Sequence, residues 1–217
     1  MGERAYLSGL GLVPDAIGLC TSTKRFVERA EMLPILIDVS AVGPVILVGT
    51  GELLERRLAL LDAAGAQVSL YSSDPLEALP EAVQGRLVGG WPQAGDVAGA
   101  ALVFGAGLSE ADGVALGEMA REQGTLVNIE DVKPLCDFHM PSLVRRGDLL
   151  VTVSTGGRAP GLARKLRRFL EGLFGPEWAG RLDQVAAQRN EWRQAGNTLP
   201  EVARKTDEFV DQQGWLS

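Results

Sequence analysis

The feature that most constrains the fold is an alternation of short apolar strands with helices across the middle of the chain. Residues 45–48 and 68–71 are typical of buried strands, and residues 52–64 between them place leucines at helical spacing. Further strands are expected at 101–104 and 126–129, with a helix at 109–123. Strands that alternate with helices of about a dozen residues predict a parallel sheet covered on both faces. We therefore expect an α/β fold with a Rossmann-like domain.

The segments outside this core have a different character. Residues 33–37 suggest an edge strand, where the proline in Leu-Pro-Ile-Leu-Ile is tolerated. Beyond Pro141, strands are expected at 143–146 and 149–153, and helices at about 160–173, 177–195 and 199–213. A small strand pair with a helical tail is a poor core of its own, so we expect a second copy of the chain to complete it as a homodimer.

Composition excludes several classes of protein. The chain has 217 residues, of which 46% are hydrophobic, and its net charge of -7 argues against a nucleic-acid partner. No apolar run approaches the roughly 20 residues of a membrane span, and residues 1–31 lack the pattern of a secretory signal. Cys20 and Cys136 are too few and too far apart for a zinc site. We expect a cytoplasmic protein without a membrane partner.

The turn Gly49-Thr50-Gly51 follows the first buried strand and begins a helix. Two glycines let the backbone approach a pyrophosphate, whose charge is met by the helix N-terminus. The third glycine of the usual dinucleotide fingerprint is replaced by Leu54. Past the end of the next strand, Asp74 is suited to ribose hydroxyls and favours NAD over NADP. A simple strand-to-helix turn and a turn aspartate are the alternatives for these residues.

Three carboxylates surround the end of the strand at 126–129. Asp131 lies where an open parallel sheet binds ligands, and it is a candidate general base. Glu130 and Asp137 are alternatives that the chemistry alone does not rank, and a solvated loop carboxylate is the structural alternative. His139 is the only histidine, so we interpret it as a packing residue and expect no metal site.

A second glycine turn, Ser154-Thr155-Gly156-Gly157, precedes the helix that begins near Pro160. Its backbone N–H groups and hydroxyls are suited to an anion. Seven basic residues surround it against the single acid Asp148: Arg145, Arg146, Arg158, Arg164, Lys165, Arg167 and Arg168. In an acidic protein this patch indicates a small polyanionic ligand, although part of it is typical of a solvated helix face.

Several short motifs occur together between residue 32 and the end of the chain: Leu33-Pro34-Ile35, Val48-Gly49-Thr50-Gly51 with Arg56-Arg57, Ala64-Gly65-Ala66, Val127-Asn128-Ile129-Glu130-Asp131, Phe138 with Met140-Pro141, and Ser154-Thr155-Gly156-Gly157 with Ala159-Pro160 and Leu162-Ala163-Arg164. Through these motifs the chain resembles the precorrin-2 dehydrogenase/sirohydrochlorin ferrochelatase family, the N-terminal module of siroheme synthases and its stand-alone relatives. It implies an intertwined homodimer with three parts: 32–141, a Rossmann-like NAD-binding domain; 142–173, a dimerisation region; and 174–217, an α-helical C-terminal domain. Residues 1–31 have no counterpart in the family and are treated as an N-terminal extension of unknown role.

The resemblance also implies an activity, in which NAD oxidises precorrin-2 to sirohydrochlorin and many members then insert ferrous iron to give siroheme. Its essential aspartate falls on Asp131. The NAD contacts implied or expected are Gly49, Gly51, Glu52, Leu53, Ser73 and Asp74, and the expected contacts to the tetrapyrrole carboxylates are Ser154, Thr155, Gly156 and Arg158. A dehydrogenase without iron insertion, and a non-catalytic tetrapyrrole- or nucleotide-binding protein, are the alternatives.

The chain departs from the family pattern near the expected cofactor site. Gly107-Leu108-Ser109 stands where family members usually carry Thr-Asp-Asp, and Leu54 stands in place of an alanine. Both changes lie in the NAD half, and neither touches Asp131.

Overall fold

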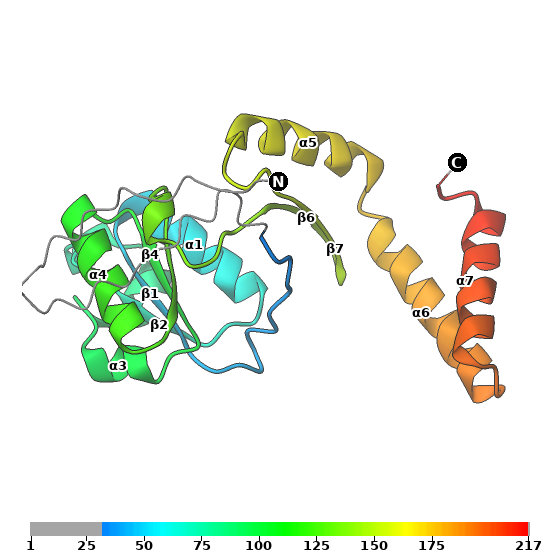
Figure 1. Cartoon of the computed structure of the whole chain (residues 1–217), viewed down its shortest axis with the longest axis horizontal. Coiled ribbons are helices and arrows are strands. Elements are labelled where there is room, and N and C mark those ends of the chain that lie inside the picture. Colours follow the sequence, from blue (N-terminus) through cyan, green and yellow to red (C-terminus); the bar gives the residue numbers. More distant parts are fainter. Residues whose placement is uncertain (1–31, 217) are drawn as a thin grey trace, which may run out of the picture. The chain divides into compact units, whose positions relative to one another are not determined.

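The described part of the chain is built around one parallel sheet. The computed structural model describes residues 32–216, so the predicted extension at 1–31 lies outside the described residues, and from residue 35 onward the chain forms one compact unit. Five strands take the order β3-β2-β1-β4-β5, all parallel. The central strands β2, β1 and β4 are labelled in Figure 1. They are β1 (Val45–Gly49), β2 (Val68–Tyr71), β3 (Leu87–Gly89), β4 (Leu102–Ala106) and β5 (Leu126–Ile129). The Rossmann-like α/β prediction is confirmed.

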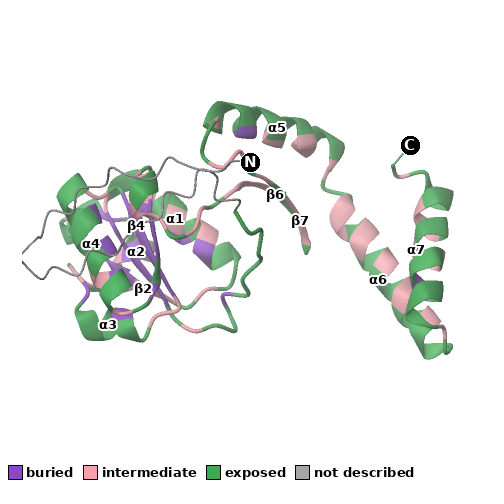
Figure 2. Ribbon diagram, in the orientation of Figure 1, coloured by how far each residue is buried: buried purple, intermediate pink, exposed green. Residues whose placement is uncertain are grey.

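Helices cover both faces of this sheet because each strand sends alternate side chains to opposite sides. Val45 and Leu47 of β1 pack with α1 (Gly51–Ala63) and α2 (Glu81–Gln84), whereas Ile46 and Val48 pack with α3 (Ala94–Ala98) and α4 (Glu110–Glu122). The buried residues accordingly lie along the sheet and the inner sides of these helices (Figure 2). Two apolar layers therefore hold the strand ends in fixed positions.

Two parts of the secondary-structure prediction were wrong or incomplete. Residues 33–37 form no strand, and Leu33 and Leu36 are largely exposed. Pro34 offers no N–H for a ladder, and apolar character alone does not supply a pairing partner. The short elements β3, α2, α3, η1 (Leu76–Ala78) and η2 (Lys133–Leu135) were not predicted. Elements of three to five residues are too short to show a full helical or strand period.

The C-terminal third carries a strand pair and three helices, as predicted. β6 (Ser142–Arg146) and β7 (Leu149–Val153) are antiparallel, and α5 (Pro160–Leu173), α6 (Trp178–Gln194) and α7 (Leu199–Gln213) follow. Arg146 joins the hairpin to the end of α5, because its Nε donates to the carbonyl of Phe174 at 2.7 Å. Within residues 32–216, no helix combines the length and the hydropathy that crossing a bilayer requires.

Candidate functional site

The strand order gathers the predicted cofactor and acid/base residues at one edge of the sheet. β1 lies between β2 and β4, and β5 follows β4, so the loops after these four strands are neighbours. From β1 the chain adds β2 and β3 on one side of the sheet and then β4 and β5 on the other side. Open α/β sheets bind ligands at such a switch point, which here lies between β1 and β4. Since adjacent strands lie about 4.8 Å apart, the turn after β5 is roughly 10 Å from the turn after β1 along this edge.

The two glycines of the first turn have different structural roles. A side chain on Gly49 would place its Cβ 2.1 Å from the carbonyl oxygen of Ala106, so this glycine lets the ends of β1 and β4 meet. Gly51 has φ +59, and a Cβ there would meet nothing within 4 Å. Gly51 therefore adopts a left-handed backbone conformation and leaves open space above the N-terminus of α1. The close approach of a cofactor phosphate to this backbone would require such space.

The loop after β4 is packed directly against this turn. Thr50 donates its hydroxyl to the carbonyl of Gly107 at 2.6 Å, and a Cβ on Gly107 would lie 2.5 Å from the carbonyl oxygen of Thr50. Gly107 has φ +69, so both its conformation and its contact require glycine. The departure at Gly107-Leu108-Ser109 is thus compatible with the fold, because Ser109 also begins α4 by accepting a hydrogen bond from the N–H of Asp112 at 3.1 Å.

Asp74 reaches the glycine turn from the neighbouring strand. Its Oδ2 accepts a hydrogen bond of 2.8 Å from the N–H of Gly51, and its own N–H donates to the hydroxyl of Ser72. No hydrogen bond to its Oδ1 occurs among the described residues, so this oxygen is available to a ligand. The residues present fit a dinucleotide cofactor, since a carboxylate oxygen at this position can accept from a ribose hydroxyl.

The other predicted cofactor residues differ in what they offer. Ser73 is exposed at the same edge, beside Asp74. Glu52 is exposed in the first turn of α1 and forms an ion pair of 2.7 Å with Arg56. The side chain of Leu53 is half-buried and packs against the core beneath the sheet, so a contact from its side chain would be apolar.

Among the three candidate carboxylates, two are already engaged by the protein. Glu130 forms an ion pair with Arg57 at 3.1 Å, with its Oε2 buried. Asp137 accepts from the N–H of Val127 at 3.1 Å and from Arg121 at 3.3 Å. Asp131 is exposed and has no side-chain hydrogen bond or ion pair within the described residues. The arrangement leaves Asp131 as the carboxylate that is available to a ligand.

The backbone at Asp131 is also unusual. Asp131 has φ 63, and within residues 32–216 every other residue with positive φ is a glycine. A left-handed aspartate costs of order 1 kcal/mol or more, and such outliers cluster at functional sites. The N–H of Glu130 donates to the carbonyl of Gly105 at 2.8 Å, which ties this turn to β4. The surrounding contacts therefore hold Asp131 at the sheet edge in a conformation that it would not adopt freely.

Buried polar contacts support the turn from below. Asn128 donates to the carbonyl of Phe138 at 2.8 Å, and the thiol of Cys136 donates to the carbonyl of Ile129 at 3.1 Å. Burial raises the pKa of the Cys136 thiol above its usual value. A raised pKa disfavours the thiolate, so this cysteine is suited to a structural role. His139 is half-buried, as a packing residue would be.

The second glycine turn is internally hydrogen-bonded. Ser154 accepts from the N–H of Gly156 and Thr155 accepts from the N–H of Ala159, both at 3.2 Å. The side chain of Arg158 is exposed beside them. A link that the sequence did not predict connects this loop to the β5 turn: the ammonium of Lys133 donates to the carbonyl of Gly156 at 2.8 Å. Residues 154–158 therefore lie next to the segment that carries Asp131.

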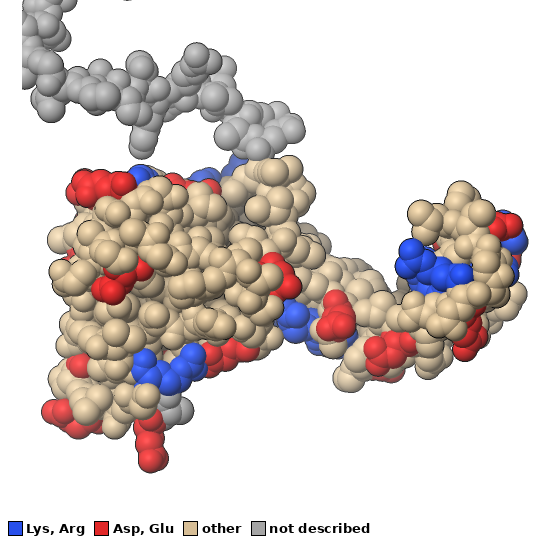
Figure 3. Space-filling view, turned by 90° about the horizontal axis from the view of Figure 1, so that it is seen from below, with Lys and Arg blue, Asp and Glu red and all other residues tan. Residues whose placement is uncertain are grey.

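The predicted basic patch contains cations that bind other groups of the protein and cations that are exposed and unpaired among residues 32–216. Arg146 binds main-chain carbonyls at the end of α5, and Arg167 pairs with Glu171 one turn along the same helix. The remaining cations are exposed: Arg145, Arg158, Arg164, Lys165 and Arg168. On the face of the molecule shown in Figure 3, acidic and basic side chains form small separate groups. The part of the patch that is exposed is thus smaller than the set of seven basic residues in the sequence.

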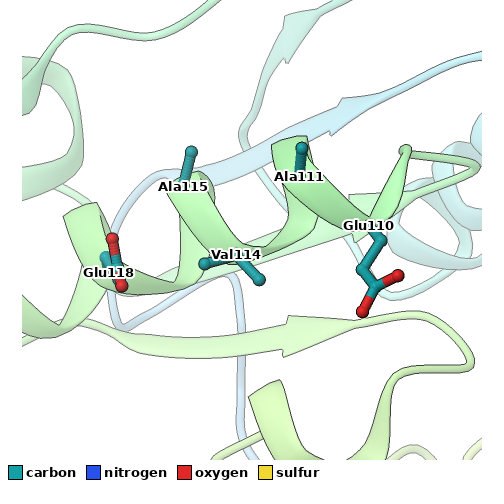
Figure 4. A pocket seen from close by; sticks show the side chains of 5 residues that line it. All are labelled: Glu110, Ala111, Val114, Ala115 and Glu118. Carbon is teal, nitrogen blue, oxygen red and sulfur yellow. The ribbon is translucent and has the colours of Figure 1, made fainter.

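A surface hollow lies elsewhere, on the outer side of α4. Glu110 and Glu118 flank its apolar floor, to which Val114 contributes (Figure 4). None of the predicted site residues lines it, so the site depends on the sheet edge and not on this hollow. No group of three or more His, Cys, Asp or Glu side chains suited to a metal ion occurs in the described part of the chain.

Arg57 and Lys133 are the site residues that sequence reasoning missed. Arg57 lies 5.4 Å from the centre of the Phe104 ring and pairs with Glu130, so it supports the Asp131 turn from α1. The sequence shows the pair Arg56-Arg57, but it does not indicate which of the two arginines packs toward the sheet. Nothing in the sequence near Lys133 indicates that it meets a loop more than 20 residues away.

Two family models match most of the described chain. Residues 35–142 match a model described as putative NAD(P)-binding, and residues 146–173 match a model described as sirohaem biosynthesis protein central. The β1–β5 sheet is therefore a domain of the NAD(P)-binding type, which takes a nicotinamide cofactor. The residues around the second glycine turn belong to the second model.

Curated relatives and a solved structure agree with these models. Siroheme synthase 1 of Pectobacterium atrosepticum is 37% identical over 164 residues, which cover 74% of this chain and 33% of that protein. Siroheme synthase of Methylobacillus flagellatus is 37% identical over 164 residues, covering 74% and 35%. The chain spans about a third of the length of these relatives. The solved structure of SirC, precorrin-2 dehydrogenase, has a TM-score of 0.65 at 18% identity, covering 86% of this chain and 93% of that one, which shows a shared fold.

Proposed function

This chain belongs to the siroheme synthase family, and from that premise we propose that it oxidises precorrin-2 to sirohydrochlorin with NAD. The observation that carries the proposal is Asp131, a left-handed carboxylate without a protein partner in the described chain. Asp131 lies on the sheet edge that also carries the Gly49–Gly51 turn. Two residues later, Lys133 contacts the 154–157 loop. A base between a cofactor turn and an anion-binding loop is suited to an oxidation that removes a hydride and a proton.

In this mechanism the bound nicotinamide supplies the acceptor for the hydride. Asp131 takes the proton that leaves a carbon or nitrogen of the macrocycle, so the two hydrogens lost by precorrin-2 leave as a hydride and a proton. Gly51 and Asp74, which are joined by a hydrogen bond, would hold the cofactor at the N-terminus of α1. Ser154, Thr155, Gly156 and Arg158 bind substrate carboxylates and orient the reacting ring toward Asp131.

The activity is tested directly under anaerobic conditions. The purified protein is mixed with enzymatically generated precorrin-2 and NAD, and NADH formation is followed together with sirohydrochlorin absorbance. Turnover that requires NAD supports the proposal. A folded protein that binds the tetrapyrrole without turnover would instead favour a non-catalytic binding protein.

Asp74 is expected to set the choice between NAD and NADP. Replacing it with alanine removes the acceptor for the ribose hydroxyls and the negative charge that repels a 2′-phosphate. We expect the KM for NAD to rise about 10-fold, the size of one hydrogen bond to a charged group, while the KM for NADP falls or stays constant. Initial rates with each cofactor at saturating precorrin-2 test this. An unchanged ratio of the two KM values would remove Asp74 from the cofactor site.

Ferrous iron is proposed as a second substrate. Asp131 is free to accept pyrrole protons when a metal enters sirohydrochlorin, and such a step needs no fixed set of metal ligands on the protein. The rate of siroheme formation from sirohydrochlorin and ferrous iron, compared with the spontaneous rate, tests this. Equal rates would leave a dehydrogenase without iron insertion.

We also propose a homodimer, with residues 142–173 as its dimerisation region between the NAD-binding domain at 32–141 and the helical domain at 174–217. One stripe of α5 exposes large apolar side chains at helical spacing: Leu162, Leu166, Phe169 and Leu173. A stripe of this kind is typical of a protein–protein contact. Phe169→Glu is expected to convert the dimer to a monomer in sedimentation equilibrium, and a wild-type monomer would refute the proposal.

A further inference from the structure

Lys133 is a cation that the fold holds beside the second glycine turn. Its ammonium donates to the carbonyl of Gly156 at 2.8 Å, across the boundary between the β5 turn and the loop that leads to α5. A Cβ on Gly157 would lie 3.3 Å from Nζ and 3.4 Å from Cδ of this lysine. The absent side chain of Gly157 therefore leaves room for the aliphatic stem of Lys133 to lie against the loop.

The charge of Lys133 has no counter-ion in the described chain. No carboxylate lies within ion-pair distance of Nζ among residues 32–216, and the side chain is exposed. A lysine ammonium has three N–H donors, of which Gly156 takes one. Two donors and a full positive charge therefore remain available at the rim of the loop.

Part of the loop's own donor set is already in use. The N–H groups of Gly156 and Ala159 donate to the hydroxyls of Ser154 and Thr155, so an anion must share or displace those N–H groups, whereas within residues 32–216 the two hydroxyl protons remain available. Lys133 lies two residues after Asp131, and its ammonium touches the loop that is expected to bind carboxylates. Among the described residues, Lys133 is thus a basic side chain that links the Asp131 turn to this loop.

We propose that Lys133 binds a carboxylate of the tetrapyrrole substrate and so positions the macrocycle between Asp131 and the 154–157 loop. The inference rests on the proposed function for the identity of the ligand. A charge-assisted hydrogen bond from an ammonium already held by Gly156 loses little side-chain freedom on binding, which favours affinity. Because the ligand is a polyanion, part of this affinity is also expected to depend on salt.

The test is binding of sirohydrochlorin without turnover, measured by anaerobic calorimetry at two salt concentrations. Lys133→Met removes the charge and keeps the stem, and Lys133→Arg keeps the charge. Lys205→Met, on α7 over the Trp192 ring, is the matched lysine control. We expect Kd to rise about 10-fold in Lys133→Met with a weaker salt dependence, to stay within about 3-fold in Lys133→Arg, and to be unchanged in Lys205→Met.

The outcomes separate this inference from the proposed activity. Unchanged affinity in Lys133→Met overturns the inference, and so does an equal loss in Lys133→Met and Lys133→Arg accompanied by a lower melting temperature. If the wild-type protein binds sirohydrochlorin through Lys133 yet does not oxidise precorrin-2, the inference stands and the proposed activity fails. If the wild-type protein oxidises precorrin-2 and Lys133→Met has the wild-type KM for precorrin-2, the proposed activity stands and the inference about Lys133 fails.

Discussion

Replacing Asp131 with asparagine is expected to lower kcat for precorrin-2 oxidation about 1,000-fold, within the range for loss of a general base. Asparagine is the informative substitution because it tolerates the left-handed backbone observed at this position, φ 63. Alanine would lose the same chemistry and add of order 1 kcal/mol of backbone strain. The KM values for NAD and precorrin-2 are expected to change little, since asparagine keeps the shape of the side chain. Anaerobic steady-state kinetics with both substrates measure this.

Asp137→Asn is the matched control for this experiment. Asp137 accepts from the N–H of Val127 and from Arg121, so its loss is expected to lower the free energy of unfolding by about 1–2 kcal/mol. Its kcat is expected to stay within about 3-fold of wild type. If Asp131→Asn keeps the wild-type kcat, the proton transfer belongs to another group. The same conclusion follows if Asp137→Asn lowers kcat about 1,000-fold.

Gly49→Ala is expected to destabilise the protein by about 3 kcal/mol, the upper part of the range for overpacking. Its Cβ would lie 2.1 Å from the carbonyl oxygen of Ala106, and that oxygen also accepts the N–H of Thr50 at 3.0 Å. Backbone on a neighbouring strand cannot rotate away as a side chain can, so β1 and β4 would have to separate. Urea denaturation followed by circular dichroism measures the change.

Gly51→Ala is the contrasting variant in the same turn. A Cβ at Gly51 meets nothing within 4 Å, so the expected cost is that of its backbone conformation, φ +59, or roughly 1 kcal/mol. The methyl group would instead occupy the space above the N-terminus of α1, and we expect the KM for NAD to rise about 10-fold or more. Similar stabilities for the two variants would contradict the distinct roles inferred here.

Local pattern determined much of this protein before tertiary structure was considered. The expected strands at 68–71 and 126–129 and the expected helices at 160–173 and 199–213 have the observed bounds, because periodicity and flanking glycines are local properties. The prediction of a strand at 33–37 was wrong because strand formation is not a local property. Whether an apolar segment pairs in a sheet depends on a partner elsewhere in the chain.

Local features of the sequence were also sufficient to predict the fold. They were not sufficient to distinguish the residues of the candidate site from one another. The glycine turn after β1 and the carboxylates after β5 were expected at one edge of the sheet, and the parallel strand order places the ends of β1 and β5 at the same edge. From the residues alone, Glu130, Asp131 and Asp137 were equivalent. Their difference lies in contacts with Arg57, Val127 and Arg121, which come from other elements.

The sequence by itself determined the α/β alternation, the two glycine turns and the set of candidate carboxylates, since each depends on residues close together in the chain. Only the tertiary structure decided which glycine is needed for packing, which carboxylate is left without a partner, and that Lys133 reaches Gly156. The physical reason is that hydrogen bonds, ion pairs and steric contacts act over a few ångströms in space. Folding brings residues that are distant in the chain within that range, and no local pattern specifies which ones meet.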